Sequence, residues 1–600
     1  ELLFFERKPS SYETAAPAHR HTDAERELIS AIHAKATQAA FHVNVRLLVK
    51  VHDARAAEQR IKVLRTSLAS YGASRYQSLQ PRINWPQAVV DYRQTAFRHR
   101  LPSLFVKNAC LLSVGEIADL YHFPYGDHTQ TENLVSSHSR DLPAPLSLKQ
   151  SPATYVLGQN SYHNALTPIG LTTAERERHV YILGGTGNGK TTLMQYGIIQ
   201  DIQAGEGVAV IDPHGDLAEN LLRYVPEDRL DDVVYFNPDD LGWPIGLNLL
   251  ELTPGIEGDE LLREKDLVTE AVISVFRKIF SDEDSGGHRI EYILRNAIQT
   301  ALTVPDATLF TVFRLLTDPA YQRGVVKALD NPDLQRFWRN ELGKAGEYQR
   351  VKMTAGITSK IGRFLFSAAA RRVLEQPRST INFDDLLAER KILICNFSKG
   401  LLGEDTSALF GITVLAKLQL SALRRARLPI ETRTPFYLYV DEFQNFATTS
   451  FTQLLSEARK YKLLVTMAEQ STSQQKDSRM INVLLANVGT VICFRTGNVV
   501  DEQLLAPLFR PFLTGSEIAN LPPFHFYMRS ASVHSQEPLS GETLLLSHPG
   551  SGEIADVVIA ASRRNYARAY VPPEEKLTQP ARPIPNSISM PLPLGNNPKS

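Results

Sequence analysis

The chain has 600 residues and a mass of 67.0 kDa, with 43% hydrophobic and 22% charged residues. This composition is that of a globular protein of several domains, and it excludes collagen-like, fibrous and wholly disordered chains. Basic and acidic residues balance at 65 each, so a polyanionic partner would have to be held by a local basic track rather than by net charge.

The cysteines and the lengths of the apolar runs indicate the cellular compartment of the protein. Cys110, Cys395 and Cys493 lie far apart among apolar residues, which favours buried free thiols over disulfides or a zinc site. No apolar run reaches the roughly 18 residues of a membrane-spanning helix, so we expect a cytoplasmic protein. The sequence starts at Glu1 rather than methionine, which leaves open a missing upstream segment that anchors the chain at the membrane.

Residues 1–150 are predicted to form a small α+β domain. Apolar residues alternate over 41–49 and then recur at helical spacing over 61–71. This pattern predicts a half-buried strand followed by an amphipathic helix.

From residue 179 onward, short apolar runs end in glycine-rich or acidic turns. The runs are VYILGG, VAVIDPHGD, KILICNFSKG, FYLYVDE, LLVTMAEQ and TVICFRTG. Strands that are apolar on both faces are typical of a parallel sheet covered by helices, and between about 255 and 385 helical periodicity replaces them. We therefore predict an α/β core in two parts, 151–254 and 386–571, an inserted all-α subdomain at 255–385, and a proline-rich disordered tail at 572–600.

Residues 184–191 read GGTGNGKT and match the phosphate-loop pattern G-x-x-x-x-G-K-[ST] between an apolar run and a helical stretch. Glycines let backbone N–H groups approach phosphates, Lys190 would reach the β and γ phosphates of ATP, and Thr191 would ligate Mg²⁺. The alternative is a glycine turn that matches by chance. The predicted nucleotide-binding residues are Gly184, Gly185, Thr186, Gly187, Asn188, Gly189, Lys190, Thr191 and Thr192.

A pair of carboxylates, Asp441 and Glu442, ends the apolar run FYLYV. Asp441 would hold the metal together with Thr191, and Glu442 would polarise a water for attack on the γ-phosphate. A solvated acidic pair at the end of a strand is the alternative. Together with the phosphate loop, the pair indicates nucleotide hydrolysis.

Further polar residues stand near strand ends. Gln470, at the tip of the next strand, is a candidate γ-phosphate sensor, or else a residue that caps a turn. Arg459 is a candidate arginine finger for a neighbouring subunit, or a solvated residue at a helix end, and Arg495 is a second candidate finger. His214, in the turn DPHGD, is a candidate residue lining the nucleotide site, or else part of a Pro-Gly turn without a function, and we do not expect it to bind metal.

These residues resemble the HerA/FtsK superfamily of RecA-like motors, and within it the type IV secretion ATPases, especially coupling proteins of the TraG/TraD kind. The resemblance covers about residues 155–535. It rests on RHVYILGGTGNGKTTL, VAVIDPHGDLAENLL, GHRIEYILRNAIQTAL, KILICNFSKGLLGE and FYLYVDEFQNFATTSFTQLLSEARKY.

The resemblance implies a RecA-like core that hydrolyses ATP with Mg²⁺ as a hexameric ring and moves DNA through its central channel. The ring would deliver a relaxase-bound strand to the secretion channel of a bacterium, at the inner membrane. It places the catalytic lysine, glutamate, finger and sensor at Lys190, Glu442, Arg459 and Gln470, and the metal aspartate at Asp441. The transmembrane helices usual in coupling proteins are absent here, and residues 20–150 look more like a channel-energising ATPase. A channel-energising ATPase and a HerA-like DNA-end-processing translocase therefore stay open.

Three basic clusters are candidate DNA contacts, although each could equally be a solvated surface. Six copies of a modest cluster around a ring channel would not require a basic monomer. The clusters are Arg424, Arg425 and Arg427; Arg459, Lys460 and Lys462; and Arg563, Arg564 and Arg568 with Tyr566 and Tyr570.

Overall fold

A computed structural model describes residues 22–43, 45–68, 87–101, 110–121, 139–146, 153–280, 287–474, 478–513, 517–530 and 537–570. The chain divides into two compact units, Glu1–Val135 and Ser136–Ser600. The tail predicted at 572–600 lies outside the described residues.

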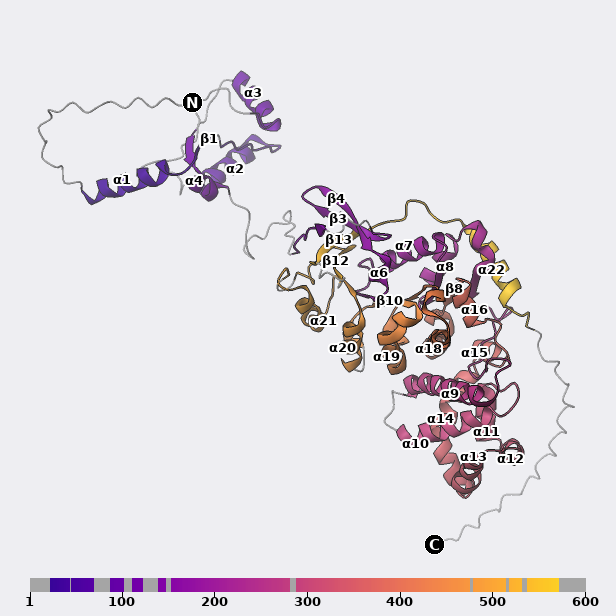
Figure 1. Cartoon of the computed structure of the whole chain (residues 1–600). Coiled ribbons are helices and arrows are strands. Elements are labelled where there is room, and N and C mark those ends of the chain that lie inside the picture. Colours follow the sequence, from indigo (N-terminus) through magenta and orange to yellow (C-terminus); the bar gives the residue numbers. More distant parts are fainter. Residues whose placement is uncertain are drawn as a thin grey trace, which may run out of the picture. The chain divides into compact units, whose positions relative to one another are not determined.

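The first unit contains helices and a two-stranded antiparallel sheet (Figure 1). The strand expected over 41–49 is shorter than predicted, because its partner strand pairs with only four of its residues, from Ala40↔Ser113 to Val43↔Cys110. The described elements are α1 (Asp23–Ala36), β1 (Ala40–Val43), α2 (Ala54–Ser67), α3 (Gln87–Arg98), β2 (Cys110–Ser113) and α4 (Val114–Leu120).

The boundary between the units lies at 135/136 rather than at the predicted 150. The described residues 139–146 belong to the second unit, and Leu142 among them bonds to its sheet. Leu142 N donates to Ser540 Oγ at 2.9 Å, and Leu142 O accepts from Asn160 Nδ2 at 2.8 Å.

The second unit is built on an 11-stranded mixed sheet with the order β4-β3-β13-β12-β11-β5-β10-β9-β6-β8-β7. The strands from β11 to β7 run parallel, whereas β12, β13, β3 and β4 are antiparallel. Their bounds are β3 (Tyr155–Tyr162), β4 (Ala165–Leu171), β5 (Val180–Leu183), β6 (Gly207–Asp212), β7 (Val233–Phe236), β8 (Ile392–Asn396), β9 (Phe436–Val440), β10 (Leu463–Glu469), β11 (Thr490–Phe494), β12 (His525–Ser530) and β13 (Leu539–Thr543).

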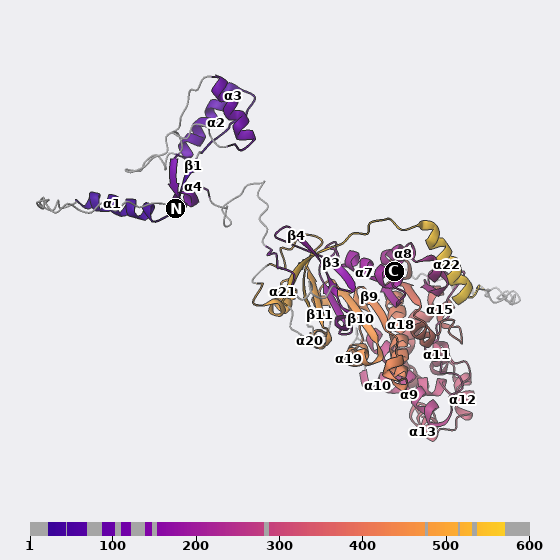
Figure 2. The same ribbon diagram turned by 45° about the horizontal axis from the view of Figure 1, so that its top comes forward.

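Both faces of the parallel strands are buried. Alternate residues face two cores: Tyr181 and Leu183 pack in one, whereas Val180 and Ile182 pack in the other. Figures 1 and 2 show the helices on the two sides of the sheet. One side carries α6 (Thr173–Arg176), α7 (Lys190–Gln203), α8 (Asp216–Leu222) and α22 (Gly552–Tyr566), and the other carries α18 (Glu404–Arg424), α19 (Thr449–Ala458) and α20 (Ser478–Asn487).

All the secondary-structure elements described between β7 and β8 are helices, and they follow an irregular stretch over 237–257. Asx-Pro pairs start two of these helices: Asp318 and Asn331 accept N-cap hydrogen bonds, and each is followed by proline at the first helical position. The elements are α9 (Gly258–Phe280), α10 (Gly287–Ala301), α11 (Leu309–Thr317), α12 (Pro319–Lys327), α13 (Pro332–Arg336), a π-helix (Phe337–Leu342), α14 (Glu347–Leu365), α15 (Ala368–Leu374) and α16 (Phe383–Ala388). These helices share one hydrophobic core with the sheet.

One stretch, Glu404–Arg427, is long and apolar enough by composition to cross a membrane, but 78% of its most apolar window is buried inside the protein. It contains α18, which packs against α9 and α16 as a core helix. The remaining described helices are α17 (Lys399–Leu402), α21 (Val499–Leu505) and the 3₁₀ turns Glu227–Asp232, Arg425–Arg427, Ile430–Thr432, Phe443–Asn445, Arg459–Tyr461, Thr472–Gln474 and Ala506–Phe509.

Candidate functional site

The sequence-predicted phosphate loop, acidic pair and sensor all lie at one edge of the sheet. They follow β5, β9 and β10, and these strands are parallel neighbours with β10 in the middle. The carboxyl ends of parallel strands meet at the same edge. Residues as far apart in sequence as Lys190 and Asp441 are thereby brought to one edge.

The phosphate loop joins β5 to α7 in a conformation that requires glycine. Gly187 has φ 75° and Gly189, the N-cap of α7, has φ 110°, which is the left-handed region that L side chains avoid. A Cβ on Gly187 would meet nothing within 4 Å, so this side of the loop is open. The N-terminus of α7 points its unpaired N–H groups into the loop and favours an anion there.

Lys190 Nζ lies within the loop and donates to Gly184 O at 2.6 Å and to Gly185 O at 3.3 Å. Burial lowers the pKa of Lys190, whereas the nearby carboxylates of Glu442 and Asp441 act to raise it. The ammonium and the acidic pair therefore share one electrostatic environment. A negatively charged ligand bound in the loop would be attracted to the Lys190 ammonium.

Asp441 is 4% exposed, and burial raises its pKa to about 6, with further contributions from the carboxylates of Glu442 and Asp212. Lys190 acts in the opposite direction. A carboxylate in this environment gains stability from a cation beside it. Asp212 is engaged locally, since it accepts from His214 N at 2.8 Å and from Ala218 N at 3.0 Å.

Glu442 has a left-handed backbone at φ 46°, which is uncommon for a residue other than glycine. Its Oε2 accepts from Gln444 Nε2 at 2.6 Å, and its Oε1 lies 3.9 Å from His214 Nε2. Burial acts to raise the pKa of Glu442, but the nearby His214, the hydrogen bond from Gln444 and the charge of Lys190 together outweigh it and lower the pKa. A carboxylate that stays ionised is the form needed in a general base.

A chain of side-chain amides joins Glu442 to the phosphate loop. Gln444 Nε2 also donates to Gln474 Oε1 at 2.6 Å, Gln474 Nε2 donates to Gln470 Oε1 at 3.3 Å, and Gln470 donates to Thr186 Oγ1. The predicted sensor Gln470 thus touches the loop. Gln444 and Gln474 were not predicted from the sequence, because their spacing does not show that the turn after β9 contacts the turn after β10.

The two candidate fingers lie in different places. Arg459 precedes β10 and pairs with Glu177, which precedes β5, so it lies at the amino-terminal edge of the sheet, opposite the phosphate loop. Arg495 follows β11, and its backbone oxygen accepts from Gly185 N at 2.9 Å. Only Arg495 is therefore close to the loop of its own subunit.

The basic clusters proposed for DNA are largely paired with carboxylates. Arg425 is 6% exposed and donates to the backbone oxygens of Leu387, Thr434 and Tyr461, so its predicted role in DNA contact is wrong: it holds a turn together. The ion pairs that these clusters form are Arg424 with Glu264 and Asp384, Arg427 with Glu260, Arg459 and Lys462 with Glu177, Arg563 with Asp240, and Arg564 with Asp231.

The residues at the loop fit a magnesium nucleotide. The open glycine loop and the N-terminus of α7 suit phosphate groups. The exposed hydroxyl of Thr191 and the carboxylate of Asp441 are oxygen donors of the kind that Mg²⁺ prefers. Burial raises the pKa of Asp441, and a cation bound beside this carboxylate would favour its ionised form.

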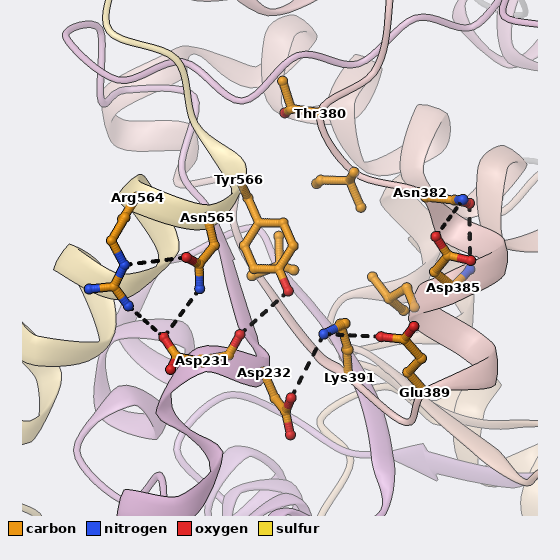
Figure 3. Close-up of a pocket in the computed structure, with 13 residues that line it drawn as sticks. Asp231, Asp232, Thr380, Asn382, Asp385, Glu389, Lys391, Arg564, Asn565 and Tyr566 are labelled. Carbon is orange, nitrogen blue, oxygen red and sulfur yellow. Dashed lines mark hydrogen bonds and ion pairs between the residues drawn. The ribbon is translucent and has the colours of Figure 1, made fainter.

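A separate cavity of about 700 Å³ lies at the amino-terminal ends of β7 and β8 (Figure 3). Its polar groups are paired with one another: Arg564 and Asn565 bond Asp231, and Lys391 lies between Asp232 and Glu389. In a parallel sheet, ligands bind at the carboxyl ends of the strands, whereas this cavity lies at their amino-terminal ends. This cavity is not the nucleotide site.

Comparison with known families confirms the predicted resemblance over part of the chain. Residues 157–417 match the family described as the central domain of helicase HerA. No curated protein is significantly similar to the chain.

Several solved structures resemble about two thirds of the chain. Plasmid coupling protein TrwB in complex with the ATP analogue ADPNP is 18% identical, with a TM-score of 0.51 over 69% of this chain and 97% of that chain. TrwB in complex with ADP and Mg²⁺ is 17% identical, with a TM-score of 0.50 over 69% and 95%. VirB4 of Thermoanaerobacter pseudethanolicus is 13% identical, with a TM-score of 0.47 over 66% and 98%. At such identities the likeness to TrwB shows the fold alone, and it confirms the predicted RecA-like α/β class.

Proposed function

Because residues 157–417 match the central domain of helicase HerA, we propose that the protein is an ATPase that translocates DNA in conjugative transfer or type IV secretion. The observation that carries this proposal is that the parallel order of β5, β10 and β9 puts Lys190, Asp441 and Glu442 at one edge of the sheet. The fold is that of TrwB, which is described as a plasmid coupling protein in complex with ADPNP and with ADP and Mg²⁺.

Each residue of the site has a role in this proposal. Magnesium ATP would supply the phosphoanhydride bond whose hydrolysis drives movement. The loop amides and Lys190 would bind the phosphates, and Thr191 and Asp441 would hold the metal. Glu442 would take the proton of the attacking water, and Gln470, which bonds Thr186, would sense the terminal phosphate.

We also propose that the working form is a homo-hexameric ring at the cytoplasmic face of a bacterial inner membrane. Arg459 supports this oligomer, because it lies at the edge of the sheet away from its own phosphate loop and would complete the site of a neighbour. The proposed partners are DNA with its relaxase and the proteins of a type IV secretion channel.

DNA-stimulated ATP turnover by the assembled protein tests this function. We expect single- or double-stranded DNA to raise the rate, and to do so less at high salt because phosphate contacts release counterions. An unchanged rate in assembled oligomers would overturn the DNA motor and leave a channel-energising ATPase.

The match to helicase HerA also favours a second candidate, a translocase that processes DNA ends. The same assay distinguishes the two candidates when linear and closed circular DNA are compared. Stimulation by linear duplex but not by closed circular DNA would support end processing.

A further inference from the structure

Phe524 combines two features that a folded chain rarely accepts in one residue. Its backbone is left-handed at φ 66°, which strains a bulky side chain. The side chain is also 42% exposed, so burial does not compensate for the strain. A strained backbone at an exposed aromatic residue indicates that the position of its ring has a function.

The ring is fixed against the phosphate loop. Phe524 N donates to Asn188 O at 2.9 Å, and Phe524 O accepts from Thr543 N at 2.9 Å. A Cβ built on Gly189 would lie 3.1 Å from Phe524 Cδ1. The aromatic ring therefore lies beside the N-terminus of α7, where the loop ends.

The sheet order determines which part of a nucleotide would face this ring. β5 lies between β10 and β11, and β12 lies beyond β11. Glu442 and Gln470 are on the β10 side of the loop, whereas Phe524 immediately precedes β12 on the other side. A triphosphate whose terminal phosphate faces Glu442 would direct its ribose and base toward Phe524.

We propose that Phe524 is the stacking platform for the base of the bound nucleotide, and that it favours purine over pyrimidine nucleoside triphosphates. This inference rests on the proposed function, since it assumes that the loop binds a nucleotide. Aromatic side chains stack on every base through its π-face, and a purine offers the larger face. We therefore expect selection between purine and pyrimidine but little selection between adenine and guanine.

Replacing the ring separates base binding from phosphate binding. Phe524→Gly removes the ring and also suits the left-handed backbone, so the variant should unfold at a temperature no lower than the unmodified protein. Calorimetric titration should show ATP binding about 5- to 160-fold weaker, which corresponds to a stacking energy of about 1–3 kcal/mol. Binding of inorganic tripolyphosphate with Mg²⁺, which has no base, should be unchanged.

Further variants serve as controls. Phe524→Tyr keeps an aromatic face and should bind ATP as the unmodified protein does, whereas Phe524→Leu keeps apolar bulk and should bind it more weakly. Phe366→Ala removes an equally aromatic side chain that is 75% exposed in the helical insertion, and should change neither affinity.

The results distinguish the platform from the proposed function. Equal ATP affinity in Phe524→Gly and the unmodified protein, or parallel losses for ATP and tripolyphosphate, would overturn the platform alone. Equal affinities of the unmodified protein for ATP and CTP would overturn the purine preference. Failure of the unmodified protein to bind ATP would overturn both the proposed function and the inference.

Discussion

Arg459 and Glu177 form an ion pair at the amino-terminal edge of the parallel sheet, with 3.4 Å between Nε and Oε2. The Arg459 side chain is 54% exposed, whereas that of Glu177 is 17% exposed. The glutamate therefore holds the arginine at the surface, facing away from its own phosphate loop. An arginine presented in this way suits the active site of a neighbouring copy.

The first prediction is complementation between subunits. Arg459→Ala should lower ATP turnover about a thousandfold, as expected for an arginine finger, while nucleotide binding persists. Rings that mix Arg459→Ala with Lys190→Ala subunits should regain part of the turnover, because some interfaces then pair an intact loop with an intact finger. Inactive mixed rings, with assembly verified by light scattering, would count against action across the interface.

The second prediction separates binding from hydrolysis. Lys190→Ala should lose nucleotide affinity, because the buried cation that faces the phosphates is removed. Glu442→Gln should bind ATP normally and hydrolyse it about 10²- to 10⁴-fold more slowly, which is the usual contribution of a general base. Single-turnover kinetics and equilibrium titration measure the two effects. Fast hydrolysis by Glu442→Gln would mean that another group is the base.

The third prediction concerns the amide chain. Gln470→Ala should keep ATP affinity and lower turnover, since Gln470 links Thr186 of the loop to Gln474 and onward to Glu442. Gln444→Leu should do the same through Glu442, whose Oε2 it would no longer bond. If the chain acts as a unit, the double variant should be no slower than the slower single variant. Additive losses in turnover would show that the two glutamines act independently.

The fourth prediction is a pH dependence of stability. Burial raises the pKa of Asp441 from 3.8 to about 6, so between these values the native state binds more protons than the unfolded state. The contribution of Asp441 to the free energy of unfolding therefore falls as pH rises from about 4 to about 6, by about 3 kcal/mol in total.

Asp441→Asn removes this titration, so it should stabilise the nucleotide-free protein more at pH 7 than at pH 4.5. Urea denaturation of both proteins at the two pH values measures the difference. A stability difference that does not change with pH would show that Asp441 titrates normally. Added Mg²⁺ and ATP should stabilise only the protein that retains Asp441.

The fifth prediction concerns packing behind the phosphate loop. A Cβ on Gly197 of α7 would lie 1.9 Å from Tyr155 Oη, and that hydroxyl bonds Tyr439 Oη at 2.9 Å. Gly197→Ala should therefore destabilise the fold by about 1–3 kcal/mol in thermal denaturation, in spite of the better helix propensity of alanine.

Two variants check this explanation. Tyr155→Phe in the Gly197→Ala background removes the closest atom and should restore part of the stability. Gly324→Ala, in α12 with nothing within 4 Å of the added Cβ, should leave the protein as stable as before or slightly more stable. A loss at Gly324 equal to that at Gly197 would disprove the steric explanation.

The sequence by itself determined the parts that depend on local pattern. The glycine loop with Lys190 and the strand ending in Asp441 and Glu442 are continuous segments, so their residue types show both the backbone conformation and the chemistry. The apolar runs likewise predicted a sheet buried on both faces, because such a sheet excludes polar residues from its strands.

Only the tertiary structure decided what meets across the sheet. Strand order put Arg459 at the edge opposite the phosphate loop, joined Gln444 to Gln470 through Gln474, buried Arg425 and set Phe524 beside Asn188. These contacts join turns that are far apart in the chain. Local sequence patterns do not predict them, because each of these side chains is compatible with many surroundings. The long-range packing of the strands selects one.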